Sequence, residues 1–343
     1  MIRISKILLY TTVLLLIIWQ LPWCYNYFFT RSEQVPFTLY SGLKHDFLSL
    51  CYQGENMASK DTKGNLYTWA QTDSLLPFFY THQLVSDGRF PDSIQGEPVN
   101  LQQVKLSNFF FRVSASDLNF EEIGLYPLLE SKSGRVDLVM PDDVFRFTKH
   151  GIEFVQMKTN AIDETKSEQF NKILSAKGFH APARLVAGNP TVRKDYDEGY
   201  LLVDQDNHLF HLKQMRGRPY VRPIELPDSL HIQSLFITEF KDHKTLALIV
   251  DNQNQLYVLH HKSYQLYKVG IPAYDPHRDN LMIVGNMLDW TVCVETDKQV
   301  GYYAVSADDY TFLQEKIYPS ENNSLPGLRF TSTKDKYVKP RFQ

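Results

Sequence analysis

The sequence has few cysteines and no excess of basic side chains. Three cysteines in 343 residues are too few for a disulfide framework, and 36 Lys and Arg are outnumbered by 39 Asp and Glu. The net charge of -3 leaves no basic excess to neutralise a phosphate backbone. The composition therefore argues against nucleic acid as a partner.

The sequence also lacks the short motifs of several enzyme classes. It contains no Gly-x-Ser-x-Gly nucleophile elbow and no glycine-rich phosphate-binding loop. These absences do not exclude an enzyme, because a repeat protein can gather catalytic residues from separate repeats. We expect no enzymatic activity, no catalytic residue and no cofactor.

Aromatic residues and turn formers are abundant. The chain is 43% hydrophobic and 13% aromatic, with 20 Tyr and 22 Phe, and it holds 16 Gly and 17 Pro. This much apolar surface can form a large core, which excludes global disorder. The mixture favours strands and turns over helices.

An apolar run near the N-terminus predicts a membrane anchor over residues 7–29. A helix needs roughly 20 apolar residues to cross the hydrocarbon core, so this run is long enough. A cleaved signal peptide is the alternative. Its cleavage site needs small residues, yet the first alanine of the chain is Ala58.

Basic residues flank this run mainly on its N-terminal side. Arg3 and Lys6 precede it, and only Arg31 follows closely, which predicts a cytoplasmic N-terminus for residues 1–6. The body then lies outside; together with the bacterial family that it resembles, described below, this implies the periplasm at a bacterial inner membrane. From residue 35 onward the chain carries 33 basic and 38 acidic side chains, a net of -5. We therefore expect the helix, and not the surface of the body, to hold it at the membrane.

One pattern repeats along the body: an apolar strand, an acidic or polar turn, and a second strand with an aromatic residue. The clearest turns lie at 204–207 and 251–255, and others at 61–65 and 296–298, with a looser copy over 136–147. A spacing of about 45 residues is typical of propeller blades and predicts six or seven of them. An all-β, propeller-like domain is the first expectation, and a pair of β-sandwiches is the alternative.

One helix interrupts this pattern. Residues 165–177 follow a capping box formed by Thr165 and Glu168, and Phe170 and Leu174 form an apolar stripe. We therefore predict a cytoplasmic N-terminus (1–6), an anchor (7–29), a linker (30–40), a propeller-like domain with one inserted helix (41–330) and a C-terminal tail (331–343).

Three stretches of the central region, residues 124–131, 133–146 and 188–200, resemble an uncharacterised bacterial family. Its members are membrane-anchored envelope proteins with a domain of unknown function, often encoded beside ABC-transporter genes. The resemblance implies an envelope protein that works with a transporter. It implies no catalytic residue.

Two acidic or mixed-charge segments are the candidate ligand or partner sites. The first is a charge-dense turn that contains Arg193, Lys194, Asp195, Asp197 and Glu198. It is either a binding loop or a salt-bridged connection between elements.

The second candidate is the pair Asp142 and Asp143, which either acts as a carboxylate site or caps a turn. We expect no metal site. The pairs His208 with His211 and His260 with His261 project to opposite faces of a strand.

Cys51 and Cys293 both lie on expected strands. If the N-terminal strand completes the last blade, the ring brings them close enough for a disulfide. Two free thiols are the alternative.

For function, the first hypothesis is a non-enzymatic, membrane-anchored envelope protein whose β-rich domain binds a protein partner, an ABC-transporter component. The second is a binding module for a small envelope ligand such as a glycan or peptide. The third is a propeller hydrolase or lyase, which would need acidic groups or histidines from two blades within hydrogen-bond reach.

Overall fold

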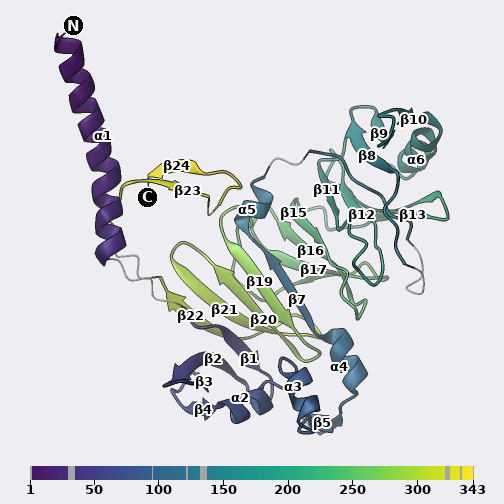
Figure 1. Ribbon diagram of the computed structural model, residues 1–343. Helices are drawn as coiled ribbons and strands as arrows, with labels where there is room; N and C mark the ends of the chain where they lie inside the picture. The colour runs from purple at the N-terminus through teal and green to yellow at the C-terminus, as the bar shows by residue number, and fades with distance from the viewer. Residues whose placement is uncertain are drawn as a thin grey trace.

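The computed structural model describes residues 2–29, 35–94, 96–120, 123–131, 137–320, 325–332 and 334–342. A long N-terminal helix, α1 (Ile2–Phe29), stands beside a body of antiparallel sheets (Figure 1). The helix is long and apolar enough to cross a membrane over Arg3–Phe29, and the protein buries none of that window. The β-rich class is confirmed. Part of the predicted linker, residues 30–34, lies outside the described residues, and β1 already begins at Thr38.

Most of the body is a succession of antiparallel sheets in chain order. The first sheet contains β1 (Thr38–Ser41), β2 (Asp46–Gln53), β3 (Asn56–Lys60) and β4 (Leu66–Thr68). The second contains β8 (Asp143–Thr148), β9 (Gly151–Gln156) and β10 (Ile162–Asp163). The third contains β11 (Leu185–Gly188), β12 (Tyr200–Val203), β13 (Leu209–Met215) and β14 (Arg218–Ile224). The fourth contains β15 (Ile232–Ile237), β16 (Thr245–Asp251), β17 (Leu256–His260) and β18 (Leu266–Lys268).

The fifth sheet joins the two halves of the chain. It contains β19 (Asn280–Gly285), β20 (Asp289–Glu295), β21 (Gln299–Ser306) and β22 (Phe312–Pro319), and β7 (Phe109–Val113) pairs with β19. The partner of β7 lies about 170 residues further along the chain, which the sequence did not indicate. Among the described residues, five sheets have three or more strands, where six or seven blades were expected.

Helices replace the blade expected after residue 68. The described segment holds α2 (Trp69–Leu75), α3 (Thr81–Ser86), α4 (Leu101–Ser107) and α5 (Ala115–Leu118), with a small hairpin of β5 (Ser93–Ile94) and β6 (Glu97–Pro98). Capping explains two of them. Thr68 and Gln71 form a capping box, and the Asn100 side chain accepts the backbone N–H groups of Gln102 and Gln103. The prediction of a single helix in the body was therefore wrong.

The predicted helix near residue 170 is confirmed, although it starts earlier. It is α6 (Glu164–Ala176), and Asp163 caps it by accepting the Lys166 backbone N–H at 2.9 Å. Thr165 was the expected cap, but Asp163 occupies that position because its carboxylate reaches the first turn. Phe170 and Leu174 are buried as expected, and Phe170 packs on Phe154 of β9.

The looser repeat over 136–147 does not form a hairpin. Val136 lies outside the described residues, and residues 137–141 form no strand. Strand β8 begins at Asp143 and turns back into β9 at residues 149–150. The residues from Leu125 to Leu129, another expected strand, form a single bridge from Tyr126 to Phe145.

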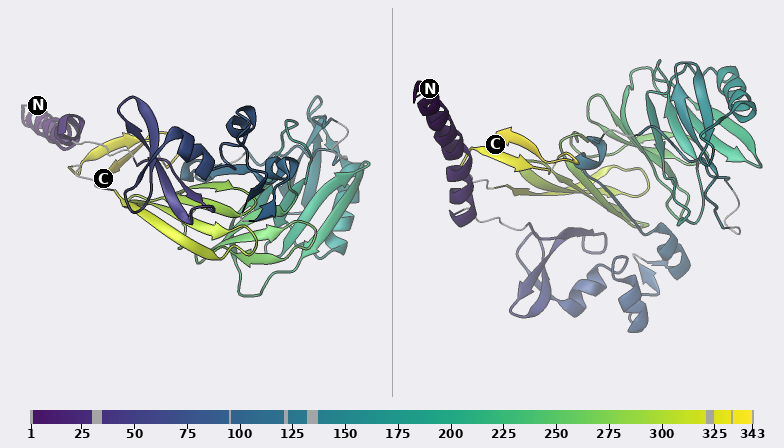
Figure 2. Two further views of the ribbon diagram at one scale, coloured as in Figure 1. Left: turned by 90° about the horizontal axis from the view of Figure 1, so that it is seen from below. Right: turned by 45° about the horizontal axis from the view of Figure 1, so that its top comes forward.

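The C-terminal segment is a hairpin and not a simple tail. Strand β23 (Leu328–Thr331) pairs with β24 (Lys339–Phe342) beside α1. Figure 2 shows this hairpin next to the helix from two further directions. Of the predicted tail, residues 333 and 343 lie outside the described residues.

Three of the repeated turns share one hydrogen-bond pattern centred on a buried aspartate. The carboxylates of Asp61, Asp204 and Asp251 each accept the backbone N–H of the residue four positions later, always at 2.8 Å. Each aspartate's own N–H donates back to the carbonyl of that residue. All three side chains belong to buried residues. We call these the aspartate turns.

The core lies between neighbouring sheets. One cluster joins Leu201 and Leu209 of the third sheet to Leu246 and Leu259 of the fourth. A larger cluster continues from the fourth sheet into the fifth through Val258, Val292 and their neighbours. Hydrophobic residues at alternating or continuous positions of each strand therefore cover the faces between successive sheets.

Replacing an aspartate of one of these turns should destabilise the fold. In Asp251→Ala the N–H groups of Gln253 and Gln255 and the Tyr257 hydroxyl lose their acceptor. We expect the free energy of unfolding in urea to fall by about 2–4 kcal/mol. The control Asp228→Ala changes an exposed residue and should stay within about 0.5 kcal/mol. Equal stability of the two variants would contradict the role of the turn.

Candidate functional site

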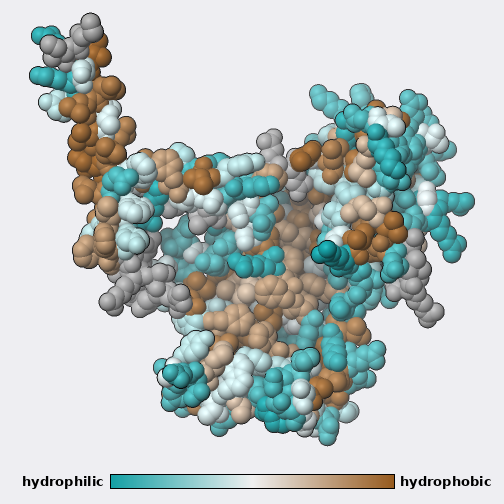
Figure 3. Space-filling view, viewed as in Figure 1, coloured by the Kyte–Doolittle hydropathy of each residue, from teal (hydrophilic) through white to brown (hydrophobic). Residues whose placement is uncertain are grey.

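A cavity of about 310 Å³ lies where the N-terminal sheet, the helices after it and the fifth sheet meet. Its walls are mostly apolar. They include Leu39, Leu43, Leu75, Leu76, Pro77, Phe78, Phe79, Phe109, Phe110 and Val284. Figure 3 shows hydrophobic residues gathered in the recessed centre of the molecule, above the N-terminal sheet and its helices. The pairing of β7 with β19 creates this site, because it brings residues near 109 against residues near 285.

Asp289 is the one carboxylate in the cavity wall. It is 2% exposed, and its Oδ1 accepts the Asn286 amide at 3.1 Å. Its Oδ2 lies against Gly42, where even a Cβ would come within 2.5 Å, and makes no hydrogen bond of good geometry. Burial raises the pKa of Asp289 to about 7, against smaller lowering effects from the Asn286 amide and the Gly42 backbone. The folded protein therefore keeps this carboxyl largely protonated below neutral pH.

A second buried acceptor faces the same cavity. The Nδ2 of Asn108 donates to the Phe78 carbonyl at 2.6 Å, but its Oδ1 has no hydrogen-bond partner among the described residues. Buried polar atoms are nearly always satisfied, by protein, water or ligand. The cavity thus has mostly apolar walls, with a buried amide oxygen and a protonatable carboxyl beside them.

Hydroxyl groups also lie in the cavity wall. They belong to Tyr40, Ser41 and Thr291. The sequence did not point to this site, because Asp289 lies in none of its charge-dense segments. A carboxylate that begins an otherwise continuous apolar strand was the available signal.

The charge-dense turn is divided between the interior and the surface. Lys194, Asp197 and Glu198 point inward, while Arg193 and Asp195 are exposed. The ammonium group of Lys194 lies 2.7 Å from Asp197 and 2.6 Å from Glu239. Burial raises the pKa of Glu239, against the opposing effect of Lys194.

Glu198 continues this network. Its carboxylate contacts Lys213 at 2.8 Å and His261 at 3.0 Å. Burial raises the pKa of Glu198, but the hydrogen bond from His261 and the charge of Lys213 outweigh it and lower the pKa to about 2. Burial lowers the pKa of His211, which packs against Glu198, to about 4. The network joins the third sheet to the fourth, as expected of a salt-bridged connection.

Asp142 and Asp143 have different partners. Asp143 is buried and contacts Lys166 of α6 at 2.7 Å, whereas Asp142 is exposed and lies 3.6 Å from Lys158. The structure thus gives the pair no shared ligand. Cys51 and Cys293 are free thiols, the first partly exposed on β2 and the second buried on β20. Of the two alternatives for this pair, the structure shows the free thiols and not the disulfide.

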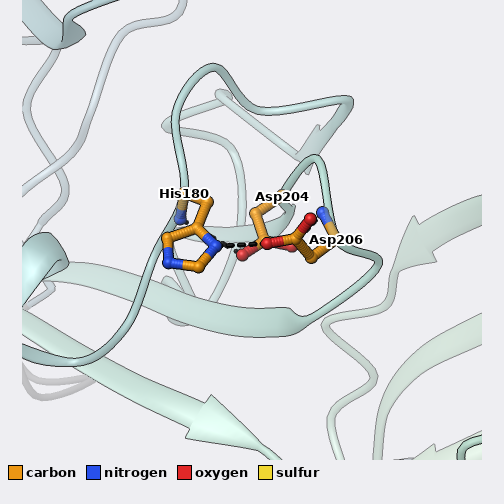
Figure 4. Close-up of side chains that lie close together, drawn as sticks. All are labelled: His180, Asp204 and Asp206. Carbon is orange, nitrogen blue, oxygen red and sulfur yellow. Dashed lines mark hydrogen bonds and ion pairs between the residues drawn. The ribbon is translucent and has the colours of Figure 1, made fainter.

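His180, Asp204 and Asp206 lie close enough to hold a metal ion, with ligand atoms within 4.8 Å of one another (Figure 4). The carboxylate of Asp204 is already engaged by the turn. It accepts the backbone N–H groups of His180, Asp206 and His208. The cluster is therefore explained by the aspartate turn and by the ion pair of His180 with Asp206. The sequence analysis named His208 and His211 instead, and His211 is buried against Tyr264 and Glu198.

Comparison with known proteins identifies a family. The model of a family described as a domain of unknown function (DUF4857) matches residues 37–305. No curated protein matches the sequence. Several solved structures resemble it, β-propellers among them.

They include the β-propeller domain of Cps50 (Swd1) from Myceliophteria thermophila, with 10% identity, a TM-score of 0.31, and 65% of this chain and 64% of that chain covered. The Dos1 propeller has 12% identity and a TM-score of 0.31, and the match covers 90% of this chain and 72% of that chain. YCF48 from Cyanidioschyzon merolae has 12% identity and a TM-score of 0.30, and the match covers 88% of this chain and 90% of that chain.

Asp289 should make the stability of the protein depend on pH. Its pKa is raised from 3.8 to about 7. Below pH 3.8 the carboxyl is protonated in both states. As the pH rises toward 7, the unfolded state ionises while the folded state stays neutral, so the free energy of unfolding falls, by about 4 kcal/mol at most.

In Asp289→Asn the free energy of unfolding should no longer show this part of the decline. Urea titrations across the same pH range measure it. The control Asp308→Asn, at an exposed position, should keep the wild-type profile. A parallel decline in the wild type and Asp289→Asn would show that Asp289 titrates normally.

Breaking the buried network should cost more than breaking a surface pair. Lys194→Met leaves Asp197 and Glu239 without their cation, and we expect unfolding to require about 3–5 kcal/mol less. Lys241→Met is the matched control, because Lys241 and Asp195 form an exposed pair at 3.3 Å. That control should lose less than about 1 kcal/mol. A binding loop that does not support the fold would leave both variants as stable as the wild type.

Proposed function

The chain belongs to the family of this domain of unknown function, and we propose that its body is a membrane-tethered binding module for a small, largely apolar ligand. The cavity beside Asp289 carries this proposal. Its volume of about 310 Å³ lies at the lower end of the range of small-molecule sites, roughly 300–1,000 Å³.

The two buried acceptors define the polar end of the ligand. Asn108 Oδ1 needs a donor, and Asp289 donates when protonated or accepts when ionised. The leucines and phenylalanines of the wall fit an aliphatic or aromatic body. We therefore propose a ligand with one apolar portion and a hydroxyl, amide or amine group at one end.

We propose a propeller-like arrangement for the scaffold. The aspartate turns recur in the first, third and fourth sheets, and hydrophobic clusters lie between successive sheets. Both features suit blades that pack face to face. The pairing of β7 with β19 gives this arrangement a contact between early and late parts of the chain.

We propose that α1 is an uncleaved anchor with its N-terminus in the cytoplasm and the body in the periplasm of a bacterial inner membrane. The support is that its apolar window is not buried by the body. Arg3 and Lys6 lie on the side assigned to the cytoplasm.

A second candidate function is the binding of a protein partner, such as an ABC-transporter component. The observation that favours it is strand β22, which pairs only with β21 among the described strands. It exposes three large apolar side chains, Phe312, Leu313 and Ile317. An edge strand of this kind can add a strand from another protein. Crosslinking in native membranes would test it, and recovery of no transporter subunit would count against it.

The ligand proposal predicts that filling the cavity abolishes binding. Native mass spectrometry of the protein extracted from membranes should show a bound small molecule. In vitro, the apolar dye N-phenylnaphthylamine should fluoresce when the protein binds it. Val284→Phe adds a ring to the cavity wall and should weaken dye binding about ten-fold or more.

The control for this test is Val192→Phe, an exposed position outside the cavity wall. It should bind the dye as the wild type does. Circular dichroism of both variants shows whether the fold is kept. Equal dye binding by a folded Val284→Phe and by the control would place the dye elsewhere and contradict the proposed site.

A further inference from the structure

The C-terminal hairpin has one apolar and one basic face. Leu328 pairs with Phe342 and Phe330 with Pro340, while Arg329 pairs with Arg341 and Thr331 with Lys339. Because successive side chains of a strand project to opposite faces, the first two pairs form the apolar face and the other two the basic face.

This hairpin packs on α1. The ring of Phe330 meets Trp19 edge to face, with centroids 5.2 Å apart, and Gly327 lies directly against Pro22. Asn26 fixes the entry of the hairpin, because its amide donates to the Leu325 carbonyl at 3.1 Å and accepts the Leu325 N–H at 2.7 Å. Residues 19, 22 and 26 lie on one side of the helix, in its C-terminal half.

Protein contacts leave much of the apolar surface uncovered. Phe330 is 51% exposed and Phe342 71%, and Tyr337 and Val338 in the connecting loop are exposed to a similar degree. An isolated two-stranded hairpin is marginally stable in water. Its apolar face therefore needs a cover beyond the single contact with Trp19.

The charge of the hairpin is opposite to that of the body. Residues 325–343 contain five basic side chains, Arg329, Lys334, Lys336, Lys339 and Arg341, and one acidic one, Asp335, for a net charge of +4. The whole chain carries -3. The net charge of the whole chain is therefore close to zero although the segment beside the helix is strongly basic.

Contacts hold these cations in place. Asp335 binds Lys339 and Arg341, and Lys334 binds Asp297 of the body at 2.5 Å. The ammonium group of Lys336 lies 3.5 Å from the centre of the Phe120 ring. Including Asp297, the local cluster keeps a net charge of +3, since five basic side chains face two acidic ones.

We propose that residues 325–332 and 334–342 form a membrane-surface element that binds anionic lipid headgroups beside α1. The apolar face and the aromatic loop residues enter the interface, and the Lys and Arg side chains bind phosphate groups. This inference rests on the proposed role of α1 as a membrane span. Because the hairpin contacts Trp19 and Pro22, the proposal places these two residues at the outer bilayer surface and the crossing part of α1 before them. Residues 2–19 rise about 27 Å as a helix, close to the roughly 30 Å of the hydrocarbon core.

The test uses the full chain with Cys24, Cys51 and Cys293 replaced by Ser. A fluorescent label is attached to one new cysteine, at Tyr337→Cys or Phe342→Cys, and the protein is reconstituted into phosphatidylcholine vesicles with or without phosphatidylglycerol. Lipids with a nitroxide near the headgroup quench labels at the surface. Phe312→Cys is the matched control, because Phe312 is 50% exposed on β22.

We expect quenching at positions 337 and 342 to exceed that at position 312 about two-fold or more, and to increase with phosphatidylglycerol. Combining Lys336→Glu with Lys339→Glu should abolish the increase. A label at Leu14→Cys, in the middle of α1, tests the anchor. Lipids with a nitroxide deep in the bilayer should quench this label if α1 crosses the membrane.

The outcomes separate the two proposals. If the Leu14 label is quenched but labels at 337 and 342 behave like that at 312, the hairpin does not bind the membrane and the anchor stands. If the Leu14 label is not quenched, both proposals fail. Quenching at 337 and 342 that is indifferent to phosphatidylglycerol overturns the binding of anionic headgroups.

Discussion

A buried carboxylate that closes a hairpin turn is the interaction on which the body depends. In the aspartate turns of Asp61, Asp204 and Asp251, the buried side chain accepts backbone N–H groups of the turn. The turn fixes the register of the two strands. A slip of one residue would turn every apolar side chain of the strand away from the neighbouring sheet, so the turns also determine which residues form the core.

The parts of the fold that the sequence predicts are those held by local interactions. The hairpins at 204 and 251 need only a turn and two apolar strands, and α6 needs a cap and an apolar stripe. The helices from Trp69 to Ser107 were not predicted, because their apolar residues follow no clear helical period. The pairing of Phe111 with Ile283 joins residues far apart in the chain, and no local pattern encodes it. The cavity depends on that pairing, so it could not be predicted either.

Charge density in the sequence proved a poor guide to binding surfaces. Lys194, Asp197 and Glu198 looked like a polar loop, but they are buried and paired between two sheets. The candidate site instead uses Asp289, which stands alone among apolar neighbours and has a raised pKa because of burial. In the sequence, a lone acid on an apolar strand gives a weaker signal than a run of charges. In the structure, its burial and its raised pKa are what make it a candidate functional residue.

Strand β20 separates the two proposed activities. Its first residue, Asp289, lies in the cavity wall, and Asp297, two residues beyond its end, binds Lys334 of the C-terminal hairpin. Seven residues at roughly 3.3 Å each keep these points on the order of 20 Å apart. The cavity wall and the hairpin share no residue. The proposed ligand site and the proposed membrane contact therefore lie at opposite ends of one buried strand and use different residues, so a substitution can abolish one and leave the other.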